Sequence, residues 1–381
     1  MFYFLNYSFN PNTAATNRTL AYMKGLSELS IETVVVFFLT DKNKNTIQTN
    51  YPNVSIEYYW KKWFYINSKY LKHICYILFL ILFYFRVKAG DIIYMYNMAD
   101  VLHWLLKKKG VRVFVEKTEH PSMYPLGSYV YRPTIKQYLA DYSSSSGVIT
   151  ISTSLKDYFI KNGVDHSKIK IINVIVDADR FKNIVPMNFE NDYFAYCGTV
   201  STFKDGVDIL IKAFAIVHSR YPFIHLRIAG RFANQSDENY LISLVKDLKL
   251  EDSVVFMGLI SASDMPSFLA GARAVLLSRP DNIQAKNGFP GKLGEYLLSK
   301  SPAIVTAVGD IPLFIKDNMN GFLVKPNDHF AFAQKMIWVL QHVSESKKIG
   351  DEGYYLAIKH FNYLSETKKL IDFIFKGNPL N

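Results

Sequence analysis

A lysine and a glutamate lie three residues apart at the start of a predicted helix, directly after a glycine-rich turn. The turn is Gly288–Gly291, and the charged pair is Lys292 and Glu295. Residues three apart on a helix are neighbours, and its first turn carries free backbone N–H groups and the positive end of the dipole. A phosphate binds well there, whereas the carboxylate suits sugar hydroxyls. The stretch therefore predicts a site for a phosphorylated sugar, such as the ribose and diphosphate of a nucleotide-sugar; a capped surface helix is the alternative.

The helix that carries this pair also has an apolar side. A turn of about 100° per residue gathers three leucines on one face: Leu293, Leu297 and Leu298. Lys292 and Glu295 fall on the opposite edge, so we expect the leucines to be buried and the charged pair to be exposed. Apolar runs on either side of the helix, at Ala274–Leu277 and Ala303–Val305, predict the strands that position it.

Other loops of this half also follow predicted strands at their carboxyl ends, where parallel sheets bind ligands. Lys204 lies in the loop Gly198–Gly206, near the start of the next helix, and this position favours an anion. Arg231 and Gly258 stand at the ends of two further strands. An ordinary surface charge is the alternative for each basic residue.

The first half begins with a strand, a loop, a helix and a strand, which is the order of a parallel βαβ unit. These elements are predicted at Phe2–Leu5, Asn6–Asn17, Arg18–Leu29 and Thr33–Leu39. A loop after the carboxyl end of such a strand is a ligand-binding position. We therefore predict that Tyr7–Asn17 is a binding loop, with Asn12, Thr13 and Asn17 contacting an acceptor substrate; a surface connection is the alternative for any single residue.

A second polar segment of the first half, Glu116–Pro121, follows the predicted strand Val111–Val115. It should lie at the same edge of the sheet as the first loop. Glu119 and His120 are further acceptor-binding candidates, and His120 could hold a proton. A structural histidine is the alternative.

The segment Tyr58–Arg86 mixes aromatic and basic side chains before an apolar run, Ile74–Phe85. A spanning helix needs about 20 apolar residues, so this run is too short to cross a bilayer. A basic, aromatic-rich helix can lie in a membrane interface, and packing on the sheet is the alternative. Both can hold, with the run as core and a membrane edge formed by tryptophans and four lysines: Lys61, Lys62, Lys69 and Lys72.

Length and charge narrow the class of protein. The 381 residues suffice for two domains, and the net charge of +11 favours phosphorylated ligands or an anionic membrane surface. The sequence carries no zinc-finger or RNA-binding signature, so nucleic acid is not a predicted partner. Cys75 and Cys197 give neither a disulfide framework nor a zinc site, which fits a reducing cytosol. The start lacks the features of a secretion signal. We predict a cytoplasmic protein, peripheral on the inner face of the cell membrane.

The alternation of strands and helices predicts an α/β fold. Two Rossmann-like domains with parallel sheets should face each other across a cleft. The strand pattern breaks at Val176–Met187. We predict an acceptor-binding domain over 1–178, a nucleotide-sugar-binding domain over 179–360, and a C-terminal helix over 361–381 that packs back towards the first domain.

The second half resembles the family-4 glycosyltransferases, which have the two-domain GT-B architecture. The matching pieces occur in the family's order and spacing over about residues 145–330: NVIVDADRF at 173–181, YCGTVSTFKDGVDILIKAF at 196–214, IAGR at 228–231, VVFMG at 254–258 and GFPGKLGEYLLSKSPAIVT at 288–306. In the first half, Glu119–Pro121 is the best local match.

This resemblance implies a retaining enzyme that moves a sugar from a UDP- or GDP-sugar to a hydroxyl without a metal or other cofactor. Lys204 and Lys292 would neutralise the diphosphate, and Glu295 would hold the ribose. The implied donor-binding residues are Gly198, Thr199, Lys204, Arg231, Gly258, Asn287, Gly288, Phe289, Pro290, Lys292 and Glu295. The predicted catalytic residues are Lys204, Lys292 and His120.

Two positions depart from the family pattern. Many members carry an arginine where this chain has Thr199, and a carboxylate where it has Asn287. The first change removes a phosphate cation that Arg231 could replace, and the second argues against a fixed catalytic glutamate. The only Asp-x-Asp near this region, Asp177–Asp179, lies in the linker, so we expect no metal site.

We predict transfer to a glycan or lipid-linked acceptor in the biosynthesis of a cell-surface polysaccharide (capsule, O-antigen or exopolysaccharide). The alternative is a catalytically silent nucleotide-sugar-binding or scaffold protein of the same fold. A phosphorylase would need a pyridoxal-bearing lysine region, which we do not find.

Overall fold

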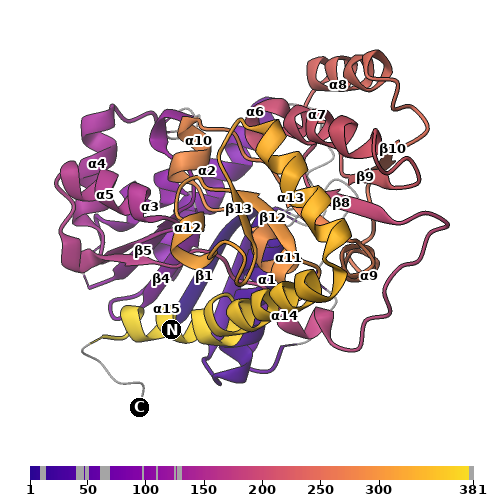
Figure 1. Ribbon diagram of the computed structural model, residues 1–381. Coiled ribbons are helices and arrows are strands. Elements are labelled where there is room, and N and C mark those ends of the chain that lie inside the picture. Colours follow the sequence, from indigo (N-terminus) through magenta and orange to yellow (C-terminus); the bar gives the residue numbers. More distant parts are fainter. Residues whose placement is uncertain are drawn as a thin grey trace. The chain divides into compact units, whose positions relative to one another are not determined.

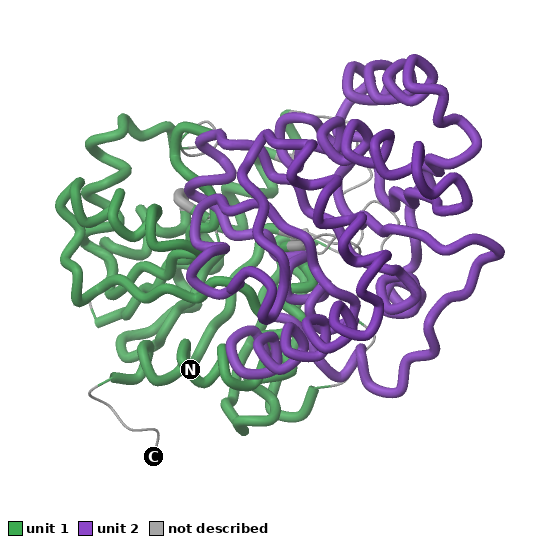
Figure 2. Tube along the Cα trace, in the orientation of Figure 1, with its two compact units in different colours: residues 1–175, 363–381 green, residues 176–362 purple. Residues whose placement is uncertain are grey.

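The chain divides into two compact units, which Figure 2 colours separately. The first comprises residues 1–175 together with 363–381, and the second comprises residues 176–362. The computed structural model describes residues 1–8, 14–39, 47, 51–60, 69–96, 98–108, 110–123, 126 and 131–376. Four residues singled out in the sequence lie outside these ranges: Asn12, Thr13, Lys61 and Lys62.

Seven parallel strands form the sheet of the first unit, in the order β3-β2-β1-β4-β5-β6-β7. Figure 1 labels three of them, β1, β4 and β5. The strands are β1 Phe2–Ser8, β2 Thr33–Leu39, β3 Val54–Trp60, β4 Ile92–Tyr96, β5 Arg112–Lys117, β6 Gly147–Thr150 and β7 Ile169–Ile171. The helices are α1 Ala14–Glu28, α2 Lys69–Arg86, α3 Ala99–Leu105, α4 Ile135–Ser144, α5 Thr153–Lys161 and α15 Tyr363–Ile374. The strand order reverses between β1 and β4, so this unit has its ligand-binding switch point there.

Six parallel strands form the sheet of the second unit, in the order β10-β9-β8-β11-β12-β13. The strands are β8 Tyr193–Cys197, β9 His225–Ala229, β10 Val254–Gly258, β11 Ala274–Leu277, β12 Ala303–Thr306 and β13 Phe322–Val324. The helices are α6 Thr202–Asp205, α7 Val207–His218, α8 Gln235–Asp247, α9 Met265–Ala270, α10 Ile283–Asn287, α11 Lys292–Leu298, α12 Ile311–Phe314, α13 His329–Gln341 and α14 Val343–His360. Here the order reverses between β8 and β11, which makes the loops after these strands the expected ligand site.

The predicted α/β class with two parallel sheets is confirmed. Short runs of Val, Ile and aromatic residues form the strands because both faces of a parallel sheet are covered. The last helix, α15, packs on α1 within the first unit: the Tyr363 hydroxyl donates a hydrogen bond to Glu28 at 2.5 Å. At the same contact, Thr367 would clash with any side chain placed at Gly25.

Several element predictions were wrong. Strand β3 and helices α4 and α14 were not predicted. The run of β3 overlaps the start of the basic aromatic segment, and α14 is a continuous helix although its sequence contains Gly350 and Gly353, which weaken a helical pattern. Asn17 lies in α1, whose first residue is Ala14, and not in the preceding loop. Lys204 belongs to a separate short helix, α6, and not to the start of α7.

Glu116 is another correction, since it lies within β5 and is fully buried. Its Oε1 accepts a hydrogen bond from Nε of Arg18 at 2.6 Å, and its other oxygen accepts one from the Tyr94 hydroxyl. Arg18 also donates to the carbonyls of Ile172 and Asn173, at 2.8 and 3.2 Å. This ion pair therefore ties α1 to the sheet and is part of the core.

Helix α2 contains the apolar run Ile74–Phe85 and buries only one of its faces. One face packs into the core of the first unit through five residues: Cys75, Tyr76, Phe79, Leu80 and Phe83. The other face exposes six apolar side chains: Tyr70, Ile74, Ile77, Leu78, Leu82 and Phe85. Among the helices that the structure describes, none has both the length and the hydropathy needed to cross a bilayer.

Candidate functional site

The switch point of the second unit brings two loops together at the carboxyl ends of β8 and β11. The Ser278 hydroxyl, just after β11, donates to the carbonyls of Asp205 and Gly206, at 2.9 and 2.7 Å. Gly206 has a φ of 62°, and a Cβ there would lie 2.4 Å from the Ser278 carbonyl oxygen. The sharp turn between α6 and α7 therefore requires glycine, and it fixes Asp205 between the two loops.

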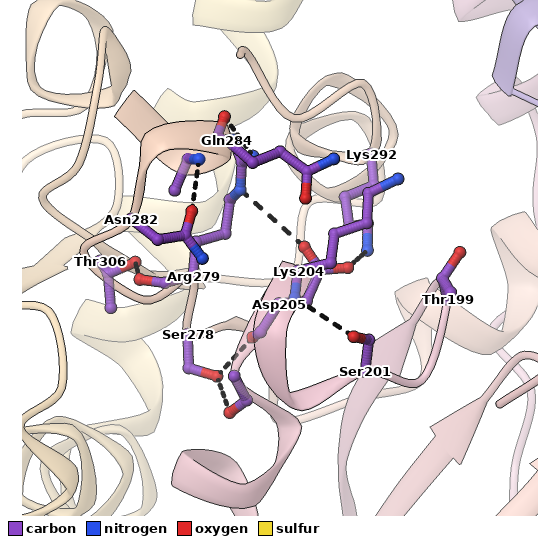
Figure 3. Close-up of polar contacts among 12 residues, drawn as sticks. Thr199, Ser201, Lys204, Asp205, Ser278, Arg279, Asn282, Gln284, Lys292 and Thr306 are labelled. Atoms are coloured by element: carbon purple, nitrogen blue, oxygen red, sulfur yellow. Dashed lines mark hydrogen bonds and ion pairs between the residues drawn. The ribbon is translucent and has the colours of Figure 1, made fainter. Parts of the chain in front are cut away.

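Asp205 is the centre of the polar network at this point (Figure 3). Its Oδ2 accepts hydrogen bonds from Nζ of Lys292 at 2.5 Å and from the Tyr196 hydroxyl at 2.8 Å. Nε of Arg279 lies 3.9 Å from its Oδ1. Figure 3 shows Lys292 and Arg279 reaching the carboxylate from opposite sides.

Electrostatics in this network follow from burial and opposite charge. Burial favours the protonated form of Asp205, but Lys292 and Arg279 outweigh it and hold the pKa of the carboxyl below its ordinary value. Burial lowers the pKa of the Lys292 ammonium, and the Asp205 carboxylate opposes that shift. Two cations around one buried carboxylate leave a net positive charge at the switch point.

Because Gly198 has no side chain, the Lys292 side chain has room to reach this network. A Cβ at residue 198 would lie 2.0 Å from Nζ of Lys292. The ammonium also sits 4.7 Å from the centre of the Tyr196 ring, within the range of a cation–π contact. The side chain of Lys292 is therefore held at the end of β8, and only 17% of it is exposed.

Glu295 lies on the same helix and has a partner that the sequence did not indicate. Nη1 of Arg180 donates to its Oε1 at 2.6 Å, and Nη2 of Arg180 donates to the Ala262 carbonyl at 2.8 Å. Burial raises the pKa of Glu295, and Arg180 opposes that shift. The Glu295 side chain is 16% exposed. The expectation that Lys292 and Glu295 are exposed was wrong, because each is drawn into an ion pair; the burial of Leu293, Leu297 and Leu298 is confirmed.

The remaining predicted donor-binding residues differ in their exposure and in their hydrogen bonds. Thr199, Lys204, Arg231 and Gly258 are exposed at or after the carboxyl ends of β8, β9 and β10. Asn287 ends α10 and bonds through its amide to the Ile283 carbonyl at 2.8 Å. The structure thus gathers these residues at one end of the sheet.

Phe289 requires a correction. Its ring is 5% exposed and packs on Phe314 and Phe361, with ring centres 5.4 and 5.7 Å apart. Gly288 and Pro290 are also buried. Any ligand contact of this turn therefore comes from its backbone and not from the Phe289 ring.

The described predicted residues of the first unit lie in two segments, Asn17 in α1 and Glu119 and His120 after β5. His120 is partly buried, its Nδ1 lies 2.7 Å from the Ser122 hydroxyl, and its ring meets the edge of Tyr158. Burial lowers the pKa of this histidine, which favours the neutral ring. Glu119 and Asn17 are also partly buried. Within the described ranges, no hydrogen bond joins Asn17 to Glu119 or His120.

Sequence reasoning missed four polar residues of the second unit: Arg180, Tyr196, Asp205 and Arg279. Asp205 was next to Lys204 in the printed motif, and its position before a glycine turn was the available signal. Arg180 and Arg279 carried no local signal, because only the folded chain brings them to α11 and to Asp205. Among the residues that the structure describes, no group of His, Cys, Asp and Glu is arranged to hold a metal ion.

A cavity of about 630 Å³ lies at the other end of this sheet. Its lining includes Asp192, Ile224 and Arg273, which directly precede β8, β9 and β11. Ligands of doubly wound sheets bind at the carboxyl ends of the strands. We therefore place the candidate site at the Asp205 network and not in this cavity.

The arrangement is suited to an anion next to a polyhydroxylated group. Lys292 supplies a fixed ammonium, and Lys204 lies exposed on the neighbouring helix. Helices α6 and α11 are only four and seven residues long, so the side chains must supply most of the positive charge. Glu295 supplies an acceptor three residues further along α11.

The chain is similar in sequence to known glycosyltransferases. Residues 191–342 match the model of the family described as glycosyl transferases group 1. Mannosylfructose-phosphate synthase of Agrobacterium fabrum is 24% identical over 256 residues, which cover 63% of this chain and 55% of that protein. An uncharacterized glycosyltransferase of Methanocaldococcus jannaschii is 24% identical over 208 residues, which cover 50% of each. The matched part thus spans about half the length of these relatives.

Solved structures show the same fold over nearly the whole chain. Anabaena HepE in complex with UDP superposes with a TM-score of 0.73 at 17% identity, covering 98% of this chain and 99% of that one. Sucrose-phosphate synthase from Thermosynechococcus elongatus gives a TM-score of 0.74 at 14% identity and 98% coverage of both chains. The chain therefore has the GT-B fold of these proteins, and its residues 191–342 are similar to the glycosyl transferases group 1 family.

Proposed function

We propose that this protein is a glycosyltransferase that moves a sugar from a nucleotide-sugar to a hydroxyl of an acceptor. The observation that carries the proposal is the pair on α11: Lys292 is held at the switch point beside β8, and Glu295 follows on the same helix. The family match over residues 191–342 and the UDP complex of HepE support a nucleotide donor. A UDP- or GDP-sugar is the proposed donor, and family 4 is the proposed branch of the group.

The chemistry we propose is electrostatic. A sugar leaves with its bond electrons on the diphosphate, and positioned cations stabilise that charge. Lys292 and Lys204 would fill this role, with the backbone N–H groups of Phe289 and Gly291 towards the sugar. In the retaining route, the acceptor hydroxyl attacks on the side of the leaving group, and its proton passes to a phosphate oxygen of the donor. This route uses neither a metal ion nor another cofactor.

A panel of UDP-, GDP- and ADP-sugars tests the activity. Incubation with each donor, with and without short glycan or lipid-linked acceptors, should release nucleoside diphosphate for at least one donor and form a glycosylated product. Binding of a donor without turnover under any condition would favour the alternative, a catalytically silent nucleotide-sugar-binding or scaffold protein.

The variant Glu295→Ala tests whether Glu295 binds the ribose of the donor. A charge-assisted hydrogen bond contributes about 1.5–3 kcal/mol, so we expect UDP to bind about 10–100-fold more weakly. Inorganic pyrophosphate has no ribose and should bind the variant and the native protein equally. Calorimetric titration with both probes makes the comparison, with Glu238→Ala on the exposed start of α8 as the control. Equal loss of UDP and pyrophosphate affinity would contradict the ribose role.

The exposed face of α2 supports a membrane-facing acceptor. Tyr70 and Phe85 are 84% and 76% exposed, and four aliphatic side chains lie between them. The 18 residues of α2 include no Asp or Glu, while Lys88 is exposed two residues beyond its end. An apolar helix face without acidic residues, followed by an exposed lysine, matches an anionic lipid surface. We therefore propose a peripheral protein of the cytoplasmic face, acting on a lipid-linked or glycan acceptor in cell-surface polysaccharide biosynthesis.

Vesicle flotation tests this surface. Leu78→Gln/Leu82→Gln should reduce binding to phosphatidylserine-containing vesicles at least about tenfold, because each leucine contributes about 1.5–3 kcal/mol when fully buried. Phe223→Gln, an equally polar change at an exposed apolar residue of the second unit, is the control. High salt should weaken the binding of the native protein. Absence of vesicle binding by the native protein, or equal binding by the double variant, would remove the membrane proposal.

A further inference from the structure

The buried carboxylate of Asp205 is unexpected in a site that is proposed to bind an anion. The side chain of Asp205 is only 2% exposed, and it lies within 2.5 Å of the ammonium that is proposed to meet a diphosphate. Its negative charge opposes an incoming phosphate, so a site selected for phosphate affinity alone would not contain it. The contacts of Asp205 show what it supplies instead.

Asp205 fixes the Lys292 ammonium at one place. The carboxylate and the Tyr196 hydroxyl both lie within hydrogen-bond distance of Nζ, at 2.5 and 3.1 Å. Asp205 is itself fixed, because Tyr196 donates to it and Ser278 holds its backbone carbonyl. A lysine side chain otherwise samples many rotamers, and holding it in advance removes that ordering cost from ligand binding.

We infer that Asp205 is the positioning residue of this site: it keeps the Lys292 ammonium charged and in place before a nucleoside diphosphate arrives. The inference rests on the proposed donor site, since it assigns Lys292 the diphosphate. It gives Asp205 a role beyond those predicted for Lys204, Lys292 and Glu295.

The charged groups around Lys292 make this role necessary. Burial favours its neutral form, and Lys204 on α6 and Arg279 after β11 add positive charge nearby. Cys197 on β8 and Glu295 on α11 are the other titratable neighbours, together with Tyr196. Among the neighbours that the structure describes, Asp205 is the only acidic residue that forms an ion pair with the Lys292 ammonium. With the carboxylate removed, the pKa of Lys292 falls further, and the amine becomes neutral at a lower pH.

Asp205→Asn tests the inference through donor affinity as a function of pH. In the native protein, the affinity for UDP should depend less on pH between about pH 7.5 and about pH 9 than in the variant, because the Asp205 carboxylate opposes the loss of the Lys292 proton. In the variant, UDP affinity should fall at least about tenfold over this range as the amine loses its proton and one charge-assisted bond is lost. Asp208→Asn, which breaks the Lys212 pair on neighbouring α7 at 3.0 Å, is the matched control and should keep the native profile.

The free energy of unfolding of Asp205→Asn should rise with pH, whereas its affinity for UDP should fall. A lysine whose pKa is lower in the folded state binds fewer protons there than in the unfolded chain, so the free energy of unfolding rises with pH. Asp205→Asn should therefore gain stability from about pH 6.5 to about pH 9 relative to Asp208→Asn, while its UDP affinity falls. A purely structural role predicts a lower stability that does not depend on pH in this way.

A second variant keeps the test decisive if Asp205→Asn is poorly folded. Asp205→Asn/Lys292→Met removes both charges and should be more stable than Asp205→Asn at neutral pH, without the rise at higher pH. A flat stability profile of Asp205→Asn, or an equal rise in the double variant, would overturn the inference. If the native protein binds no UDP or GDP, the proposed donor site fails, whereas the stability profiles still decide whether Asp205 keeps Lys292 charged.

Discussion

Replacing Lys292 with alanine should reduce sugar transfer by at least about 100-fold. The loss of one group that stabilises developing negative charge typically costs a factor of about 10²–10³ in kcat. Lys292 is the fixed cation of the switch point, since it bonds to Asp205 at 2.5 Å and stacks on the Tyr196 ring. The exposed Lys204 has no comparable constraint and should not replace it. Initial rates at saturating donor measure the effect, with Lys335→Ala on the Asp317 pair as the control.

Loss of folding must be separated from loss of chemistry in this experiment. Lys292→Ala leaves the buried Asp205 carboxylate with only the more distant Arg279 as a cation, so it should cost part of the about 3–5 kcal/mol of a broken buried pair. The variant Lys292→Met with Asp205→Asn removes both charges, so it should regain stability but not transfer. Full activity in either folded variant would show that Lys292 does not act on the diphosphate.

Replacing Glu116 with alanine should destabilise the first unit by about 3–5 kcal/mol, because it leaves the Arg18 guanidinium buried and unpaired. The pair links α1 to β5 and, through backbone carbonyls, to the end of β7. By contrast, Glu57→Ala breaks the Arg86 pair, in which both side chains are about one third exposed, and should cost less than about 1 kcal/mol. Chemical denaturation followed by far-UV circular dichroism compares the two variants.

A further variant distinguishes pairing from packing at this position. Arg18→Met/Glu116→Leu removes both charges and should recover most of the stability lost in Glu116→Ala, because apolar replacements of buried pairs are often neutral or stabilising. If Glu116→Ala were no less stable than Glu57→Ala, the ion pair would not be part of the core.

Local patterns were sufficient for the architecture of both units. Strands β8, β11 and β12 of the second unit are short, largely apolar and largely buried runs, which are visible in the sequence. The leucines of α11 were placed correctly for the same reason. Strand β3 was not predicted, because its run VSIEYYW merges with the aromatic and basic residues that follow.

The candidate site could be predicted only in outline. The positions of Lys292 and Glu295 on one helix follow from sequence spacing, but their burial depends on residues far along the chain. Asp205 is 87 residues from Lys292, and Arg180 is 115 residues from Glu295. Phe289 shows the converse: a residue in a ligand-binding turn points into an aromatic cluster that includes Phe361, which no local pattern indicates.

The most direct test of the donor site is a crystal structure of the protein with a UDP- or GDP-sugar bound. The account predicts diphosphate oxygens within hydrogen-bond distance of Nζ of Lys292, near the carboxyl ends of β8 and β11, and a ribose hydroxyl at Glu295. A nucleotide bound instead in the cavity beside Asp192 and Arg273, with Lys292 still paired only to Asp205, would contradict it.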